Sequence, residues 1–354
     1  MGHMDKTIKL RDVAAAAGVS HGTVSNVFNR PERVREELRE RVLEAARVLG
    51  YAGPSPKGRL LRTGKVNAIG FAADQPLQYL FTDPWARRLL IEVGRLCDDR
   101  GAGLALVSVT ERQSTGWNIE NALVDGFLLS GSGREFLVEM SQRRGLPFVS
   151  LSPNAGDPDL PAICIDDFGG AFLAARHVLD LGHRRIAALG FGVGDGTGRV
   201  APEEVRAAPS LNVRERARGY WAALAEAGIP EAEMPVHAVR RSKGGHAGEA
   251  LAVLFADRRS APTALLAMSD HLALAAMAWL AAQGLRVPED VSVVGFDGVP
   301  EGAASAPPLT TMEQPYRRIA ERAVAAILDD DLPEGREVLP LRLVVRESTG
   351  PAPM

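Results

Sequence analysis

The apolar residues of the first 50 positions recur with a helical period, in three short groups. The first group lies on one face of the segment 10–17, and Gly18 interrupts the period where a left-handed turn favours glycine. The second group follows Ser20, a favourable residue for capping the start of a helix, and the third spans 35–49 up to Gly50. The apolar positions concerned are Val13, Ala14, Ala17, Val24, Val27, Val34, Leu38, Val42, Ala45, Ala46 and Leu49. The pattern predicts three short helices, of which the first two form a helix-turn-helix.

From Val66 onward the pattern changes, and short apolar runs alternate with longer stretches of helical period. The runs that predict strands are Val66–Ala72, Leu104–Val109, Gly126–Leu129, Phe148–Leu151, Ala162–Ile165, Ile186–Gly190, Ala264–Ala267 and Val291–Phe296. The stretches that predict helices are Pro84–Arg100, Phe136–Arg144, Gly170–Leu181, Val213–Ala227, Gly245–Asp257 and His271–Gln283. Such alternation indicates βαβ units with parallel sheets, and the length of the region favours two lobes over one. Because open parallel sheets bind ligands beyond the carboxyl ends of their strands, we expect a binding cleft between the lobes.

The second predicted helix carries a polar face opposite its apolar one. The residues of this face are His21, Gly22, Thr23, Ser25, Asn26 and Asn29, and all but the glycine can form hydrogen bonds with a phosphate or a base edge. Since the second helix of a helix-turn-helix enters the DNA major groove, this face predicts DNA binding. A pair of amphipathic helices packed inside a larger domain is the alternative interpretation of the same pattern.

The distribution of charge favours the DNA-binding interpretation. Residues 5–62 carry 12 Lys and Arg against 7 Asp and Glu, whereas the whole chain has a formal net charge of −3. A basic head on an acidic body suits a polyanionic partner at the head only. The segment 51–64, YAGPSPKGRLLRTG, has the two Pro and three Gly of a linker, yet it contains two adjacent leucines.

Composition excludes several other classes of protein. An apolar content of 46% with 24% charged residues is typical of a soluble globular chain. No apolar run reaches the length of a membrane span, and no signal peptide precedes the head, so we expect a cytoplasmic protein without a membrane partner. Cys97 and Cys164 have the spacing of neither a metal site nor a disulfide framework.

Two groups of residues invite a cofactor or catalytic interpretation but do not support it. Gly190–Gly198, GFGVGDGTG, fits no register of a dinucleotide-binding or P-loop motif, so we expect a glycine loop at the mouth of the cleft. His177 and His183 lie six residues apart, the wrong spacing for two metal ligands on one helix face. No Ser-His-Asp or Cys-His set can be assembled, so we expect no enzyme, no cofactor and no metal.

The segment 12–29, DVAAAAGVSHGTVSNVFN, resembles the DNA-binding head of the lactose/galactose repressor family. The resemblance implies phosphate contacts from Ser20, Thr23, Ser25 and Asn29, and base readout from His21, Gly22 and Asn26. This sequence departs from the family at Asn26, where Arg or His is common, and Gly22 has no side chain that could read a base. In the linker, the resemblance implies a short helix formed on DNA, with Leu61 inserted into the minor groove and Arg59 beside it.

Further phrases in the same order extend the resemblance over nearly the full chain. They are VDGFLLSG at 124–131, DDFGGAFLAARHVLDLGHRRIAALG at 166–190, RARGYWAALAEAGIP at 216–230, PTALLAMSD at 262–270, GLRVPEDVSVVGFDGVPE at 284–301 and PPLTTMEQP at 307–315. This region resembles periplasmic sugar-binding proteins, which implies an α/β fold of two Rossmann-like lobes joined by three crossovers, behind the all-α head. The expected domains are a head at 5–50, a hinge linker at 51–65 and an effector-binding and dimerisation core at 66–350. Within the core, we expect an N-lobe of about 66–165 and 299–329 and a C-lobe of about 166–298 and 330–350.

The positions that match the family's effector contacts lie mostly at the ends of predicted strands. They are Trp85, Ser130, Asp166, Arg216, Ser269, Asp297 and Gln314. Carboxylate and guanidinium groups suit bidentate hydrogen bonds to sugar hydroxyls or to a carboxylate, so a sugar or nucleoside-like effector is expected. The opposing interpretation is that Arg216 and Asp297 merely pair across the cleft. Ser152, where an acidic residue is common, and Gly298, where the usual motif has a second Asp, leave the effector open.

Together these features predict a homodimeric transcriptional regulator, a repressor, that binds a palindromic double-stranded DNA operator. A small-molecule effector in the cleft would change the population of its DNA-competent state. A sensor or solute-binding protein without a DNA role is the alternative, and the head argues against it. An enzyme that processes sugars or nucleotides is a further alternative, which a turnover assay would reveal.

Overall fold

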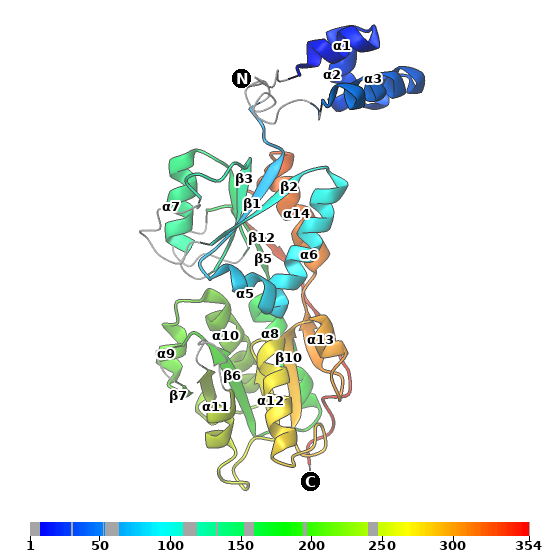
Figure 1. The fold of residues 1–354 in the computed structure, drawn as a ribbon. Coiled ribbons are helices and arrows are strands. Elements are labelled where there is room, and N and C mark those ends of the chain that lie inside the picture. Colours follow the sequence, from blue (N-terminus) through cyan, green and yellow to red (C-terminus); the bar gives the residue numbers. More distant parts are fainter. Residues whose placement is uncertain are drawn as a thin grey trace, which may run out of the picture. The chain divides into compact units, whose positions relative to one another are not determined.

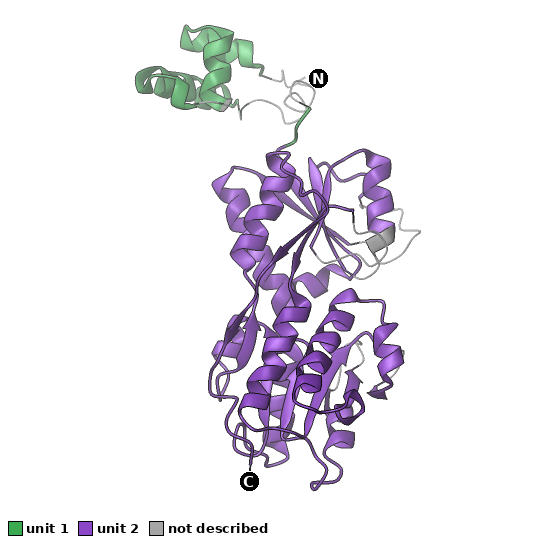
Figure 2. Ribbon diagram, turned by 180° about the vertical axis from the view of Figure 1, so that it is seen from behind, with its two compact units in different colours: residues 1–66 green, residues 67–354 purple. Residues whose placement is uncertain are grey.

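The computed structural model describes residues 8–29, 31–51, 53, 64–108, 119–131, 134–151, 159–193, 197–239 and 247–353. The chain divides into two compact units, residues 1–66 and residues 67–354 (Figure 2). None of the helices within the described ranges has the length and hydropathy of a membrane span.

The first unit is a small helical bundle. Its elements are α1 (Leu10–Ala17), α2 (His21–Asn29), a 3-10 turn (Pro31–Arg33) and α3 (Glu36–Leu49). Gly18 ends α1 with a φ of +62° and Gly50 ends α3 with a φ of +68°, both in the left-handed conformation that favours glycine. The shared core consists of Val13, Ala14, Ala17, Val24, Val27, Val42 and Ala46. The predicted helix-turn-helix is therefore confirmed.

The second unit consists of two lobes, each built around one sheet (Figure 1). The N-lobe sheet has the strand order β12-β5-β4-β3-β1-β2, and every neighbouring pair is parallel. Its strands are β1 (Ala68–Ala73), β2 (Gly103–Ser108), β3 (Gly126–Ser130), β4 (Phe148–Ser150), β5 (Ala162–Ile165) and β12 (Arg336–Leu339). The helices of this lobe are α5 (Leu77–Thr82), α6 (Pro84–Asp99), α7 (Arg134–Arg144) and α14 (Tyr316–Leu328). Helices α6 and α14 pack on one face of the sheet and α7 packs on the other.

The C-lobe sheet has the order β13-β11-β10-β9-β6-β8-β7, with antiparallel strands only at its two edges. Its strands are β6 (Ile186–Phe191), β7 (Gly198–Val200), β8 (Val236–Val239), β9 (Ala264–Ala267), β10 (Ser292–Asp297), β11 (Thr310–Glu313) and β13 (Arg342–Val344). The main helices are α8 (Asp167–Asp180) and α10 (Leu211–Glu226) on one face, and α11 (Ala247–Leu254) and α12 (Asp270–Ala282) on the other. Shorter pieces are α9 (Pro202–Arg206), a 3-10 turn (Glu231–Glu233) and α13 (Pro300–Ala303).

The chain passes between the lobes three times, after β5, after β11 and after β12. The predicted α/β architecture of two parallel-sheet lobes with three crossovers is confirmed.

Two predicted lobe boundaries are wrong. Residues 299–329 were expected in the N-lobe, but β11 pairs with β10 and β13 in the C-lobe sheet, so the chain returns to the N-lobe only at α14. Residues 330–350 were expected in the C-lobe, but β12 pairs in parallel with β5 at the edge of the N-lobe sheet. The physical reason is that a four-residue strand joins whichever sheet edge offers it hydrogen-bonding partners. The sequences of β11, TTME, and β12, REVL, contain no pattern that indicates which sheet each strand joins.

Candidate functional site

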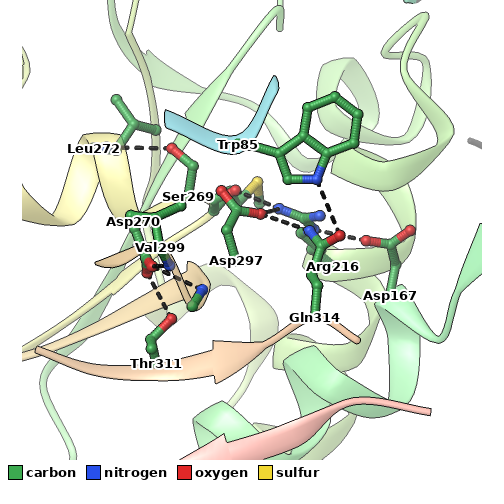
Figure 3. A network of polar contacts seen from close by, with 12 residues as sticks. Trp85, Asp167, Arg216, Ser269, Asp270, Leu272, Asp297, Val299, Thr311 and Gln314 are labelled. Carbon is green, nitrogen blue, oxygen red and sulfur yellow. Dashed lines mark hydrogen bonds and ion pairs between the residues drawn. The ribbon is translucent and has the colours of Figure 1, made fainter. Parts of the chain in front are cut away.

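A network of buried charged side chains lies at the carboxyl ends of β9 and β10, with Arg216 at its centre (Figure 3). Arg216 comes from α10 and is only 4% exposed. Its Nε donates a hydrogen bond to Oδ1 of Asp167 at 2.7 Å, and its Nη1 donates to the main-chain oxygen of Met268 at 2.5 Å. The same Nη1 lies 3.9 Å from Oδ1 of Asp297, and the guanidinium carbon lies 3.6 Å from the centroid of the Phe296 ring. The guanidinium is thus held between two carboxylates and over an aromatic face, away from bulk water.

A chain of hydrogen bonds connects this network to the N-lobe. The side chain of Gln314 donates from Nε2 to Oδ1 of Asp297 at 2.7 Å. Its Oε1 accepts a hydrogen bond at 3.0 Å from the indole Nε1 of Trp85, at the start of α6 (Figure 3). Gln314 lies at the crossover between β11 and α14, so the bond to Trp85 joins an N-lobe helix to the C-lobe charges.

Burial dominates the protonation of the two carboxyl groups. It raises the pKa of Asp167 above its usual range, and the positive charge of Arg216 opposes this rise only in part. The pKa of Asp297 is raised well above its usual range for the same reason, again against the opposing effect of Arg216. For Arg216 itself, burial lowers the pKa, but the charges of Asp167 and Asp297 outweigh it and the net shift is upward.

Two buried polar atoms beside the network have no hydrogen-bond partner among the described residues. They are Oδ2 of Asp167 and the hydroxyl oxygen of Tyr316, whose residues are 3% and 4% exposed. Burial is the main cause that raises the pKa of Tyr316 well above its usual value, and the negative charge of Asp297 is the next. Because unsatisfied buried polar groups are costly, such atoms are typical of sites that a ligand completes.

Asp270, at the start of α12, fixes the backbone beside the network. Its Oδ2 accepts hydrogen bonds from the main-chain N–H groups of Gly298 and Val299, both at 2.7 Å, and its Oδ1 accepts one from the Thr311 hydroxyl at 2.6 Å. Gly298 has a φ of +77°, and a β-carbon there would lie 2.7 Å from the α-carbon of Glu313. This chain therefore has no room for the second Asp that the usual motif places at 298.

The structure brings together four of the seven predicted effector residues, Trp85, Arg216, Asp297 and Gln314. Of the other three, Ser130 is the buried last residue of β3. The side chains of Asp166 and Ser269 cap helices: Asp166 accepts from the N–H of Gly169 at 2.8 Å, and Ser269 accepts from that of Leu272 at 3.2 Å. Neither capping bond tests a role in ligand binding, so all seven assignments stay predictions. Ser152 lies outside the described residues.

The prediction missed Asp167 and Tyr316. The Asp166–Asp167 pair before an apolar helix was an available signal, because the first Asp of such a pair caps the helix and leaves the second free to face a neighbour. The proposed pairing of Arg216 with Asp297 across the cleft is wrong in one respect, since both residues belong to the C-lobe. The shortest contact of Arg216 with a carboxylate is with Asp167 instead.

A hollow of about 370 Å³ lies at the crossover that carries Gln314. Its lining consists of Arg88, Gly298, Glu313, Gln314, Pro315, Tyr316, Arg317, Arg318 and Glu321. Two of its arginines form ion pairs with nearby glutamates, Arg88 with Glu92 and Arg317 with Glu321. The third arginine of the lining, Arg318, is exposed and forms no ion pair with the described residues.

Metal-binding clusters are absent from the part of the chain that the structure describes, where no three His, Cys, Asp or Glu side chains are grouped around a common point. His183 is fully buried and structural: its Nδ1 faces the Thr263 hydroxyl at 2.9 Å, and its Nε2 faces the Ser292 hydroxyl and the main-chain oxygen of Gly350, both at 3.0 Å. The structure describes residues 190–193, 197 and 198 of the glycine segment 190–198. The first two of these residues belong to the end of β6, and Gly198 is the first residue of β7.

In the head, the predicted DNA-contacting residues fall on α2 and its N-terminus. Ser20 caps the helix, since its hydroxyl accepts from the N–H of Thr23 at 3.1 Å, and the two hydroxyl oxygens lie 2.9 Å apart. His21, Gly22 and Asn26 are exposed. Thr23 and Ser25 are half-buried, and Asn29 is the last residue of α2. Arg59 and Leu61 lie outside the described residues.

Comparisons with known proteins add to these observations. Residues 9–53 match the bacterial regulatory proteins of the lacI family, and residues 175–349 match a periplasmic binding protein-like domain. An HTH-type transcriptional regulator of Mycobacterium tuberculosis is 38% identical over 352 residues, which cover 94% of this chain and 97% of that protein. The solved structure of a lac repressor dimer bound to operator and the anti-inducer ONPF has a TM-score of 0.75 and 26% identity, covering 98% of this chain and 100% of that one. A complex of the transcriptional regulator CelR with cellobiose has a TM-score of 0.63 and 29% identity, covering 96% and 99%.

Proposed function

Because this chain belongs to the LacI family of bacterial regulatory proteins, we propose that it represses transcription as a homodimer bound to a palindromic operator. The chain is a DNA-binding transcriptional regulator with a helix-turn-helix head and an effector-binding domain. Its family consists of transcriptional regulators, and we assign it no catalytic activity of its own. We place its action in the cytoplasm, where its DNA lies.

The head supports the DNA part of the proposal. Helix α2 presents His21, Gly22 and Asn26 to solvent, and its N-terminus is closed by the Ser20 cap. Exposed polar groups at the start of a recognition helix can reach base edges, while the neighbouring hydroxyls contact phosphates. Two heads related by a two-fold axis match an operator whose half-sites are related in the same way. We assign residues 5–50 to this head and 51–65 to the hinge linker.

The buried network around Arg216 is the observation that carries the effector part of the proposal. It combines a paired cation, unsatisfied polar atoms and an indole from the opposite lobe within the core, 66–350. We propose that the effector binds here, in contact with Trp85, Arg216, Asp297 and Gln314, and that Ser130, Asp166 and Ser269 lie at the margin of the site. Asp167 joins this set on structural grounds.

We propose that the Trp85–Gln314 hydrogen bond couples ligand binding to the relative positions of the two lobes. A ligand that forms a hydrogen bond with Trp85 or Gln314 in place of this bond would remove a contact between α6 of the N-lobe and the crossover that follows β11 of the C-lobe. The linker ends just before β1 of the same lobe, so we propose that the change reaches the head through the linker and alters the population of the DNA-competent state.

The experiment that tests the DNA part uses the full chain and a pool of randomised duplexes. Repeated selection is expected to enrich an inverted repeat, because each head of a dimer reads one half-site. Asn26→Ala is expected to relax or change the preferred bases. Val48→Ser, a change at an exposed position of α3, serves as the control and is expected to select the same repeat as the wild type. Failure to enrich any sequence, or enrichment of an unrepeated one, would contradict the proposal.

The roles of Leu61 and Arg59 in the minor groove stay predictions from the sequence. A side chain that unstacks a base step is needed only on the operator, whereas random DNA can be held by phosphate contacts. Leu61→Ala is therefore expected to weaken operator binding more than binding to a scrambled duplex at the same salt concentration. Equal losses on both duplexes would mean that Leu61 does not insert.

A further inference from the structure

We propose that the hollow at the crossover after β11 is a second ligand site, which binds small molecules through a phosphate group. The inference goes beyond the proposed function and does not depend on it, since none of the arginines that line the hollow belongs to the network around Arg216. Gln314 borders both sites, because it lines the hollow and its side chain donates to Asp297. The volume of the hollow, about 370 Å³, lies in the range of small-molecule sites, about 300–1,000 Å³.

The wall of the hollow comes from both lobes. Arg88 lies on α6, and α14, whose first residues belong to the wall, packs beside α6 in the N-lobe (Figure 1). Gly298 follows β10 and Glu313 is the last residue of β11, so these two residues belong to the C-lobe. A ligand in the hollow therefore contacts elements on both sides of the crossover.

Arg318 provides an unpaired positive charge in the wall. Its side chain is exposed and forms no ion pair with the described residues. A guanidinium group presents parallel N–H donors that match the oxygens of a phosphate group, and it stays charged at all relevant pH values. This arginine can therefore bind an anion without giving up an existing partner.

The other two arginines of the wall are only partly neutralised. Glu92 pairs with both Arg88 and Arg95, each at 3.0 Å, so one carboxylate is shared by two guanidinium groups. Arg317 pairs with Glu321 at 2.9 Å, but the arginine side chain is 71% exposed. Because exposed ion pairs within a helix contribute little to stability, Arg317 can turn from Glu321 to a ligand at small cost.

The carboxylates of the wall do not outweigh these positive charges. Glu313, the remaining acidic residue of the wall, pairs with Arg342 on β13. The charged residues of the lining and of the ion pairs connected to them are thus five arginines and three glutamates. The surplus of two positive charges suits a phosphate ester, whose charge at pH 7 is about −1.5 to −2, and it would repel a cation.

The start of α14 adds uncharged donors to the same wall. The main-chain N–H groups of Arg317 and Arg318 have no acceptor among the described residues, and no side chain caps the helix. Such N–H groups point out of the helix at its N-terminus, where phosphate groups bind readily. Tyr316 also lines the hollow, and its buried hydroxyl has no partner in the same part of the chain. A buried polar group of this kind is typical of a site that a ligand completes.

The first test measures binding to the full chain by isothermal titration calorimetry. The probes are phenyl phosphate, inorganic phosphate and phenol, at one fixed ionic strength in a phosphate-free buffer. We expect phenyl phosphate to bind with a dissociation constant of about 1 mM or lower, and phenol, which lacks the charge, to bind about tenfold more weakly or not at all. Equal affinities for phenol and phenyl phosphate, or no binding of the ester, would overturn the inference.

Inorganic phosphate separates two sources of the ligand. Binding as tight as that of phenyl phosphate identifies the free anion as a sufficient ligand, whereas weaker binding shows that the organic part of the ester also contributes. Both results support recognition through the phosphate group.

The second test locates the binding, because the basic head could also attract an anion. Arg318→Ala removes the unpaired guanidinium and is expected to raise the dissociation constant of phenyl phosphate by about tenfold. Since this side chain is exposed and has no ion-pair partner among the described residues, the substitution leaves the fold intact. Arg143→Ala is the matched control: it removes the same charge from an exposed side chain of α7, on the opposite face of the N-lobe sheet, and is expected to bind like the wild type.

Arg88→Gln provides an independent variant on the other side of the hollow. Glu92 keeps its pair with Arg95 in this variant, and the dissociation constant is expected to rise by about threefold or more. Wild-type affinity in Arg318→Ala, or equal losses in Arg318→Ala and Arg143→Ala, would overturn the inference. Either result would leave the proposals on DNA binding and on the effector unchanged, since both concern other parts of the chain.

Discussion

At the scale of single residues, Arg216 is both a candidate ligand contact and the counter-charge of a buried acidic pair. Its own exposure is 4%, and Asp167 and Asp297 are 3% and 6% exposed. Removing one partner of a buried ion pair leaves the other charge in a medium of low polarity. The arginine therefore cannot be altered for binding studies without a cost in stability.

We expect Arg216→Ala to lower the free energy of unfolding at pH 7 by about 3–5 kcal/mol. The measurement is urea unfolding followed by tryptophan fluorescence, which reports on the two-lobed unit because all four tryptophans lie beyond residue 66. Arg218→Ala, two positions along α10 with a surface pair to Glu215, is the control and is expected to change stability by about 0.5 kcal/mol or less.

The loss in the free energy of unfolding caused by Arg216→Ala should become smaller as the pH falls. Burial already raises the pKa values of Asp167 and Asp297 in the folded protein, and loss of the guanidinium removes the effect that opposes the rise. Groups with raised pKa values in the folded state favour folding when protonated, and this stability is lost as the pH rises through the folded values. An equal loss at pH 7 and pH 5 would contradict this account.

His237, on β8, makes the stability of the C-lobe sensitive to acid. Burial is the main cause that lowers its pKa to about 4, followed by the charge of Arg199, and its Nδ1 has no partner among the described residues. Because the folded value lies below the ordinary value of 6.5, the stability contributed by the neutral ring is present above pH 6.5 and lost as the pH falls toward 4.

Replacing His237 should therefore flatten the pH profile of stability. Relative to the wild type, His237→Leu is expected to gain up to about 3 kcal/mol between pH 7 and pH 4, since each pKa unit corresponds to about 1.4 kcal/mol. The measurement is the same fluorescence-detected unfolding across this pH range. His271→Gln, at an exposed position of α12, is the control, and a profile that stays parallel to the wild type in His237→Leu would contradict the prediction.

At the scale of elements, the turn between β10 and α13 depends on a glycine for two reasons. Gly298 has a φ of +77°, and a β-carbon there would lie 2.7 Å from the Glu313 α-carbon. Gly284, after α12, has a similar φ of +70° but nothing within 4 Å of the added carbon. The two positions therefore separate backbone strain from steric crowding.

We expect Gly284→Ala to cost about 1–2 kcal/mol, the strain of a left-handed residue with a side chain. Gly298→Ala should cost about 2–5 kcal/mol, because the crowding against β11 adds to this strain. Fluorescence-detected unfolding of both variants gives the comparison. Equal losses would show that the turn can move away from β11.

Element prediction succeeded where a continuous apolar run carried the signal. β5 and β9 were predicted to the residue, since each is a mostly buried run of four apolar residues that begins directly after a Pro or a Thr. β11 was missed, because its sequence TTME has no apolar run to mark it. The second strand of the N-lobe shifted by one residue, from the predicted 104–109 to Gly103–Ser108.

The candidate site was predictable only in part for a related reason. Trp85, Arg216, Asp297 and Gln314 lie in four separate segments, and matching the family's motifs found all of them. Motifs do not record the direction in which a side chain points, so the difference between Asp166, which caps a helix, and Asp167, which binds Arg216, became visible only in three dimensions.

At the scale of the whole molecule, we expect the full chain to sediment as a dimer at micromolar concentration. Two heads on one two-fold axis bind a palindromic duplex with both half-sites engaged, which a monomer cannot do. Sedimentation velocity over a dilution series measures the size of the free protein. The complex of the chain with one operator duplex serves as the reference, because it is expected to contain two chains, one head for each half-site. A stable tetramer, or a monomer throughout the series, would contradict the prediction.

The interleaving of the two lobes also sets the order in which the protein can form on the ribosome. Helix α14 and strand β12 complete the N-lobe, and β13 then adds the last edge of the C-lobe sheet. Neither lobe can therefore close until nearly the whole polypeptide has been translated. The three helices of the head, by contrast, are complete within the first 50 residues. A nascent chain thus carries a finished head well before the part that controls it exists.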